Sequence, residues 1–175
     1  QGSELPLPEI QSEPELRLLA QAFTAASTKS SSSGAVLEPI ASQRPKKLLG
    51  HLALIRQPSA PIEPAGASGQ DESEGADVLY QRPLQRPLRH IAVMRAPNFV
   101  VKYLEGPAVP YEIAEYAGVF RVDAEADAAF ARAEPPTHDD WIPDLLLDAA
   151  EKTYVRVALR RAKDAVGTFA APPPI

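Results

Sequence analysis

The apolar run within residues 89–95 and the alternating positions of residues 99–104 predict two β-strands. In the second segment the side chains from Phe99 to Tyr103 alternate between an apolar face and a face that carries Lys102. An Ala-Pro-Asn sequence separates the two segments, and Pro followed by Asn favours a tight turn. The pattern therefore predicts a β-hairpin.

Two further strands are predicted from residues 48–56, a short continuous apolar run, and from residues 115–122, where large and small side chains alternate. The first of these runs has an echo later in the chain. His51–Pro58 and His90–Pro97 both begin with His, continue through four apolar residues and end in Arg-x-Pro. The echo fits either chance similarity between short strands or a duplicated strand that ends at its proline, which has no N–H with which to continue a ladder.

The first helix is predicted at residues 12–26, where Ser12 and Glu15 form a capping-box pattern. The apolar stripe that follows consists of Leu16, Leu19, Ala20 and Phe23. A helix of this length is marginal in water by itself. We therefore expect the stripe to dock either on its own domain or on another chain.

Three more predictions concern the second half of the chain. Asp123 is expected to cap a short helix at 124–133, and Thr137 to cap another that continues to about residue 150. Residues 153–168 fit two patterns, and we favour a strand at 153–159 that leads into a short helix. The alternative is one helix with an apolar stripe of Val155, Leu159, Ala162 and Val166.

Nineteen prolines, nine glycines and a serine run indicate that parts of the chain are linkers. We expect an α+β protein built on a small antiparallel sheet of three to five strands, with helices on one face. The predicted organisation is a tag remnant at 1–3, an arm with the docking helix at 4–26, a linker at 27–47, a strand at 48–56, a flexible acidic and Pro-rich loop at 57–85, an α+β core at 86–169 and a tail at 170–175.

Several classes of chemistry lack the residues they need. The chain has no cysteine, which excludes disulfides, thiolate metal sites and a cysteine nucleophile. It also has neither a phosphate-binding glycine loop nor a GxSxG motif, and no apolar run long enough to cross a bilayer. We therefore predict no cofactor and no membrane span.

Histidine and aspartate are the remaining candidates for catalysis. His138 and Asp139, together with His90, could form the first ligand shell of a divalent metal, as in a metal-dependent hydrolase or nuclease. Helix capping and strand ends explain these residues without a metal, and we favour that explanation. Metal-dependent catalysis is therefore an alternative and not the leading interpretation.

The net charge of −5 argues against nucleic acid as the main partner, because phosphate binding depends on Lys and Arg. The basic residues are nevertheless grouped, at Arg82–Arg95 and at Arg156–Lys163. No aromatic side chain lies between Arg82 and Met94 to stack on bases. A nucleic-acid-binding module that uses these two basic segments is the second alternative.

The leading interpretation is a non-catalytic interaction or accessory module that binds another protein or domain, as a fragment of a larger bacterial protein. The docking helix and the extended Arg-Pro-Leu repeats supply the surfaces that it would use. The residues predicted to contact the partner are Leu16, Leu19, Phe23, Arg82, Arg86 and Arg89. The sequence leaves the oligomeric state and the compartment open, and we expect the native N-terminus to be missing.

Overall fold

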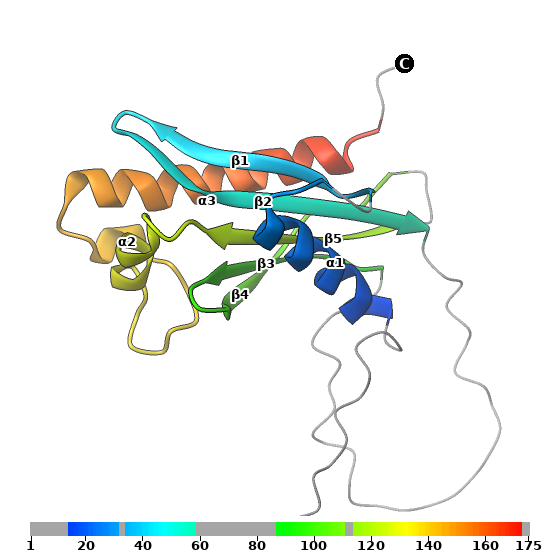
Figure 1. Ribbon diagram of the computed structural model, residues 1–175, viewed down its shortest axis with the longest axis horizontal. Helices are drawn as coiled ribbons and strands as arrows, with labels where there is room; N and C mark the ends of the chain where they lie inside the picture. Colours follow the sequence, from blue (N-terminus) through cyan, green and yellow to red (C-terminus); the bar gives the residue numbers. More distant parts are fainter. Residues whose placement is uncertain (1–13, 32–33, 59–86, 111–113, 173–175) are drawn as a thin grey trace, which may run out of the picture.

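The computed structural model describes residues 14–31, 34–58, 87–110 and 114–172 (Figure 1). These residues form an α+β fold, with three α-helices and one five-stranded sheet, which confirms the predicted class. The strands are β1 (Val36–Gln43), β2 (Lys46–Pro58), β3 (Arg89–Arg95), β4 (Phe99–Glu105) and β5 (Ala114–Val122). The predicted hairpin is confirmed as β3 and β4.

The sheet is mixed, with strand order β1-β2-β5-β3-β4, whereas an antiparallel sheet was expected. After the hairpin the chain returns between β2 and β3, so that β5 is antiparallel to β2 and parallel to β3. The two echoed segments, β2 and β3, therefore flank the same central strand. Alternation along one strand carries no information about its neighbour's direction, and for this reason the sequence did not show the parallel pair.

Helices cover both faces of the sheet, not one face as predicted (Figure 1). The helix α1 (Pro14–Thr28) lies on one face, and α3 (Ala149–Ala170) lies on the other with α2 (Asp127–Arg132) and the 3₁₀ turn η3 (Pro143–Leu145). The central strands are apolar on both sides. Leu52 and Leu54 of β2 face α3, while Ala53 and Ile55 face α1, so each face needs its own cover.

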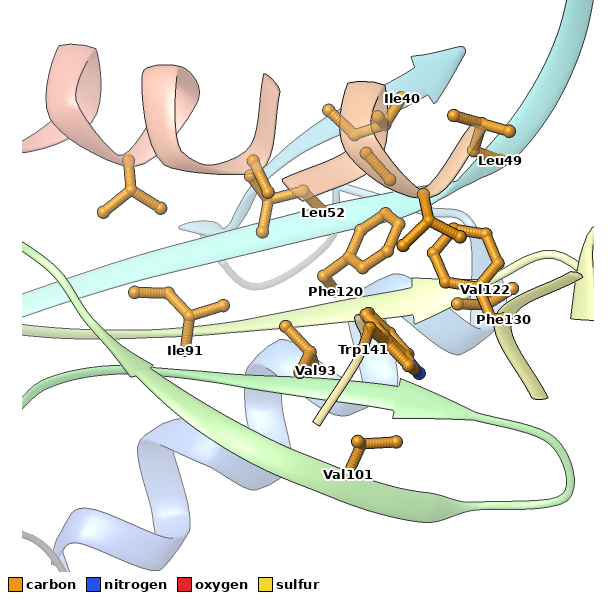
Figure 2. Close-up of a cluster of buried hydrophobic side chains, with 14 of the residues drawn as sticks. Ile40, Leu49, Leu52, Ile91, Val93, Val101, Phe120, Val122, Phe130 and Trp141 are labelled. Atoms are coloured by element: carbon orange, nitrogen blue, oxygen red, sulfur yellow. The ribbon is translucent and has the colours of Figure 1, made fainter. Parts of the chain in front are cut away.

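The core on the α3 face is built around three aromatic rings, those of Phe120, Phe130 and Trp141 (Figure 2). The Phe130 and Trp141 rings meet edge to face with centroids 4.7 Å apart, and the Phe120 ring lies 6.2 Å from Trp141. All three side chains are almost fully buried. They join β5, α2 and the segment before η3 into one core.

The predicted docking helix is confirmed as α1, and it docks on its own sheet. Its buried face is offset from the predicted stripe: Leu16 is exposed and Phe23 is only partly buried. The buried residues are Leu18, Leu19, Ala22, Ala25 and Ala26. Small alanines allow the helix to approach the alanine-rich surface of Ala53, Ala92 and Ala117 closely, so the largest side chains do not mark the contact face.

The predicted linker at 27–47 is wrong, because it contains β1 and the start of β2. As an outer strand, β1 buries little beyond Ile40 and Ser42. Its order comes from backbone pairing with β2. The argument from low apolar content therefore fails for a strand whose stabilising bonds are made by the main chain.

The helix predicted from Thr137 to about residue 150 is also wrong. Thr137 hydrogen-bonds Asp139, and only η3 is helical before α3 begins. Pro143 lacks the N–H that a continuous helix would need at that position. Residues 153–159 are not a strand, since the 22-residue helix α3 spans them, as the alternative pattern indicated.

The shorter helix α2 begins at Asp127, later than the predicted residue 124, and its N-cap residue Ala126 makes no side-chain cap. The Asp123 carboxylate instead accepts the Glu125 amide at 3.2 Å in the preceding turn. The real side-chain cap lies at α3, where the Asp148 carboxylate accepts the Glu151 amide at 2.9 Å.

The predicted core at 86–169 does not stand alone, because β2 lies in the middle of the sheet and α1 covers one of its faces. The predicted tag remnant, most of the loop at 57–85 and the end of the tail lie outside the described residues. Among the helices that are described, none combines the length and the apolar character needed to span a bilayer.

Candidate functional site

The two outer strands of the described sheet, β1 and β4, differ in their capacity to pair with a further strand. β1 carries Pro39, which has no N–H to donate, so its outer edge is interrupted. β4 contains no proline, and among the residues that the structure describes its backbone pairs only with β3. The free edge of β4 is therefore the one that can accept another strand.

The hydrogen bonds at the end of the hairpin show which β4 residues face outward. The Gly106 amide donates to the Arg89 carbonyl at 2.8 Å, so Gly106 faces β3. Because the pattern alternates in an antiparallel pair, Leu104 also faces β3, and the backbone groups of Tyr103 and Glu105 face away from the sheet. A bulge near Val101 limits the regular part of this edge to Lys102–Glu105.

A groove of about 590 Å³ lies beside this edge, between β4 and α3. The groove exists because α3 packs mainly over β1 and β2, near the edge of the sheet that is farther from β4, and leaves this face of β4 uncovered. Its apolar lining consists of Ile91, Leu104, Pro107, Leu159, Ala162 and Val166. A side chain that projects from an added strand toward α3 would enter this groove.

Tyr116 and Gly106 shape the end of the groove. A Cβ atom at Gly106 would lie 2.1 Å from the Tyr116 hydroxyl oxygen, so only glycine fits there. The Tyr116 hydroxyl donates to the Pro107 carbonyl at 2.7 Å. Burial raises the pKa of Tyr116 to about 12, against the opposing effects of Arg89 and Arg56, so this donor keeps its proton.

Three charged residues line the groove. Lys102 pairs with Asp140 in the loop before η3, and Glu105 pairs with Arg89. Lys163 of α3 is exposed, and it has no ion-pair partner within residues 14–172 as far as they are described. The groove therefore presents one uncompensated positive charge next to an apolar lining.

β4 also carries two exposed aromatic side chains, Tyr103 on the face opposite the groove and Phe99 opposite Arg95 beyond the bulge, with exposed fractions of 45% and 44%. Tyr103 lies opposite Ala92 in the ladder. Since α1 packs on β5 and β2, it does not cover these rings. Large apolar side chains on both sides of a free strand edge are typical of a surface that binds another chain.

The residues predicted to contact a partner lie in different environments. Leu19 is buried and Phe23 is partly buried against the sheet, so both stabilise this protein's own fold. Arg121 lies over the Phe23 ring at 5.5 Å. Arg89 pairs with Glu105 beside the groove, and Leu16 is exposed. Arg82 and Arg86 fall outside the described residues.

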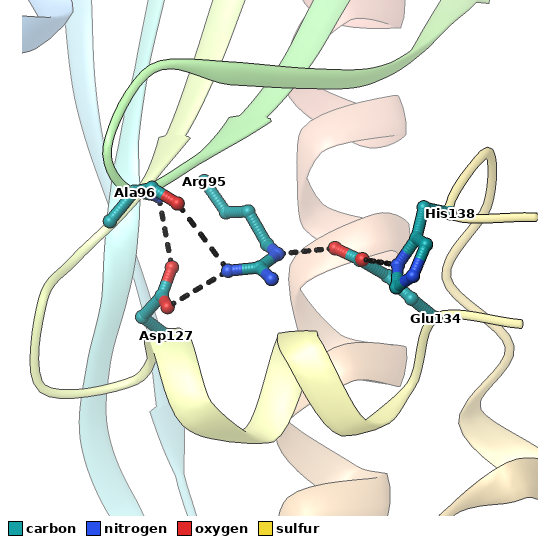
Figure 3. A network of polar contacts seen from close by, with 5 residues as sticks. All are labelled: Arg95, Ala96, Asp127, Glu134 and His138. Carbon is teal, nitrogen blue, oxygen red and sulfur yellow. Dashed lines mark hydrogen bonds and ion pairs between the residues drawn. The ribbon is translucent and has the colours of Figure 1, made fainter. Parts of the chain in front are cut away.

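The three histidines do not meet. His51 pairs with Arg121 in the β2–β5 ladder, and His90 pairs with Ala117 of the same strand from its other side. His138 lies in the segment after α2, near the end of β3 that carries Arg95, and its Nδ1 contacts the buried Glu134 carboxylate at 2.8 Å (Figure 3). Asp139 binds the Thr137 hydroxyl instead. The part of the chain that the structure describes contains no group of three or more metal-binding side chains.

The environments of His51 and His90 lead to a pH prediction. Burial is the main cause that lowers the pKa of both imidazoles from 6.5; Lys29 adds to the effect at His51, and the attraction of Glu105 opposes it at His90. The unfolded chain then binds more protons below about pH 6.5, so the free energy of unfolding should fall as the pH decreases from 7 to 5. Urea denaturation at several pH values measures this slope. The double variant His51→Gln/His90→Gln should flatten it, and an unchanged slope would contradict the assignment.

The sequence did not single out the groove or the edge. Alternation in 99–104 and the stripe from Val155 to Val166 each marked one wall, but no local pattern says that β4 is an outer strand or that α3 leaves its face uncovered. No protein family, curated protein or solved structure was found to match this chain.

Proposed function

We propose that this chain is a non-catalytic interaction module that binds an extended segment of another protein along β4. One observation carries the proposal: β4 is an outer strand with a proline-free edge, and it lies directly beside an apolar groove. Strand addition of this kind obtains affinity from main-chain hydrogen bonds and specificity from pockets that take alternate side chains.

The two edges of the sheet support this choice of strand. The interruption of β1 by Pro39 is a common protection of an edge strand, and β4 lacks it. Alternate side chains of an added strand would contact the groove on one face and the Tyr103 ring on the other. Both contacts are apolar, so they favour a protein segment over a nucleic acid, which would need cationic and stacking groups in succession.

We expect Tyr103→Pro to weaken strand addition, because it removes an outward-facing N–H from the free edge. Peptides are first selected from a displayed random-peptide library on the unmodified protein. Their dissociation constants, measured by fluorescence anisotropy, should rise at least about tenfold with Tyr103→Pro, the equivalent of one lost hydrogen bond and an unsatisfied carbonyl.

Tyr103→Thr is the matched control, since it removes the same ring and keeps the amide. Peptide affinity should then change by less than about threefold. Thermal unfolding of both variants verifies that the sheet is intact. If the two variants bind the selected peptides equally well, β4 is not the binding edge and the proposal is wrong.

A further inference from the structure

The charges around the groove are unevenly compensated. On the β4 wall, Lys102 is paired with Asp140 and Glu105 with Arg89. On the α3 wall, Lys163 follows Leu159 by four residues and precedes Val166 by three, so the three side chains lie along one flank of the helix. Over the described residues, no carboxylate pairs with Lys163. A ligand in the groove therefore meets apolar side chains and then a free ammonium group.

The rest of this flank is basic as well. Lys152 and Arg156 lie on the same side of α3, two to three turns before Lys163, and both contact Asp144. The single carboxylate is highly exposed and serves two cations. The flank that overlooks the groove thus carries a net positive charge in a protein whose overall charge is negative.

The spacing of an added strand fits this arrangement. A strand paired with β4 would lie about 4.8 Å beyond it and project every second side chain toward α3. Two such side chains are separated by about 6.6 Å, close to the length of an extended lysine side chain. When one of them fills the apolar groove, the next is in position to approach Lys163.

On the premise of the proposed function, we infer that the bound segment is acidic, with an apolar residue in the groove and an aspartate or glutamate two positions away that pairs with Lys163. The apolar lining selects the first side chain, and the uncompensated ammonium group selects the second. The pair specifies register and direction as well as partner, because a shift of one residue would turn both side chains away from the groove.

The test uses three pools of fluorescein-labelled peptides of about nine residues, a common strand length. Each pool has β-branched residues throughout and random aliphatic residues at one central position. The position two residues away is Glu in the first pool, Gln in the second and Lys in the third. Dissociation constants are measured by anisotropy on the full chain.

We expect the Glu pool to bind about fivefold more tightly than the Gln pool, and the Lys pool to bind least tightly. Lys163→Glu should reverse the order of the Glu and Lys pools. Arg161→Glu is the matched control: it makes the same change of charge on an exposed position of α3 that lines the groove on the other side of the helix. It should leave the order unchanged.

The outcomes separate the inference from its premise. If Tyr103→Pro weakens binding but all three pools bind equally and Lys163→Glu has no effect, the binding edge stands and the acidic preference is wrong. If no pool binds, or Tyr103→Pro changes nothing, both are wrong. If Lys163→Glu and Arg161→Glu weaken the Glu pool equally, the preference arises from overall charge and not from this groove.

Two other occupants of the surface give distinct results. A second copy of the chain paired through β4 would appear in light scattering as a concentration-dependent dimer that Tyr103→Pro dissociates. A nucleic acid would appear as a labelled thymidine oligonucleotide that binds more tightly than the Glu pool and loses affinity steeply with added salt. Either result would overturn the inference.

Discussion

Phe120→Ala should reduce the free energy of unfolding by about 4 kcal/mol, which is within the range for removing a buried aromatic side chain. Phe120 is 1% exposed, and its ring packs against those of Phe130 and Trp141. The two surrounding rings belong to separate elements, so they cannot collapse together into the cavity. Urea denaturation monitored by circular dichroism measures the loss.

Phe99→Ala is the control for this substitution. It removes the same side chain from β4, where 44% of Phe99 is exposed, so the expected loss is under about 1 kcal/mol. The near-ultraviolet circular dichroism of Trp141 should change in Phe120→Ala and not in Phe99→Ala, because the Phe120 ring packs against the indole. Equal losses in the two variants would show that the aromatic cluster is not the centre of the core.

Arg95→Met should destabilise the protein by about 3 to 5 kcal/mol, the usual loss when one partner of a buried ion pair is removed. Arg95 pairs with Glu134, whose side chain is 1% exposed, and with Asp127 at 3.2 Å (Figure 3). Asp127 also accepts the Ala96 amide at 3.0 Å. Without the guanidinium group, the Glu134 carboxylate retains only its contact with the exposed His138.

Two further variants test this explanation by urea denaturation. In the double variant Arg95→Met/Glu134→Gln the buried charge is gone, so much of the lost stability should return. Arg132→Met removes an exposed partner of Glu151 and should leave the free energy of unfolding nearly unchanged, because water screens a pair at the surface. If the double variant is less stable than Arg95→Met, the unpaired charge is not the cause.

The candidate site could be predicted only in part, because its two walls come from distant parts of the chain. The hairpin that contains β4 was predicted correctly, since alternation and a Pro-Asn turn are local signals. The position of β4 at the edge depends on β5 returning between β2 and β3. Lys163 gained significance only from the groove that it lines with Leu159 of its own helix and with Leu104 of β4 on the other wall.

The incorrect predictions share a physical cause, which is that they assigned side chains a role before their neighbours were known. The stripe from Leu16 to Phe23 was chosen by helical spacing, whereas the buried face of α1 is offset from it and consists of Leu18, Leu19, Ala22, Ala25 and Ala26. Residues 153–159 alternate as a strand would, yet they belong to the helix α3. This helix packs through Val155, Ala158, Ala162, Val166 and Ala170, which follow the helical period. Local periodicity of short apolar runs fits both structures.

The sequence by itself determined the elements whose signals are local: the β3–β4 hairpin, the strands β2 and β5, the helix α1 and the α+β class. These follow from alternation, turn residues and capping over a few residues. The tertiary structure alone decided strand order, the parallel pairing of β3 and β5, and the cover on both faces. Within the described residues it also decided which edge and which lysine have no partner, because these depend on contacts between residues far apart in the chain, whose pairing no local pattern records.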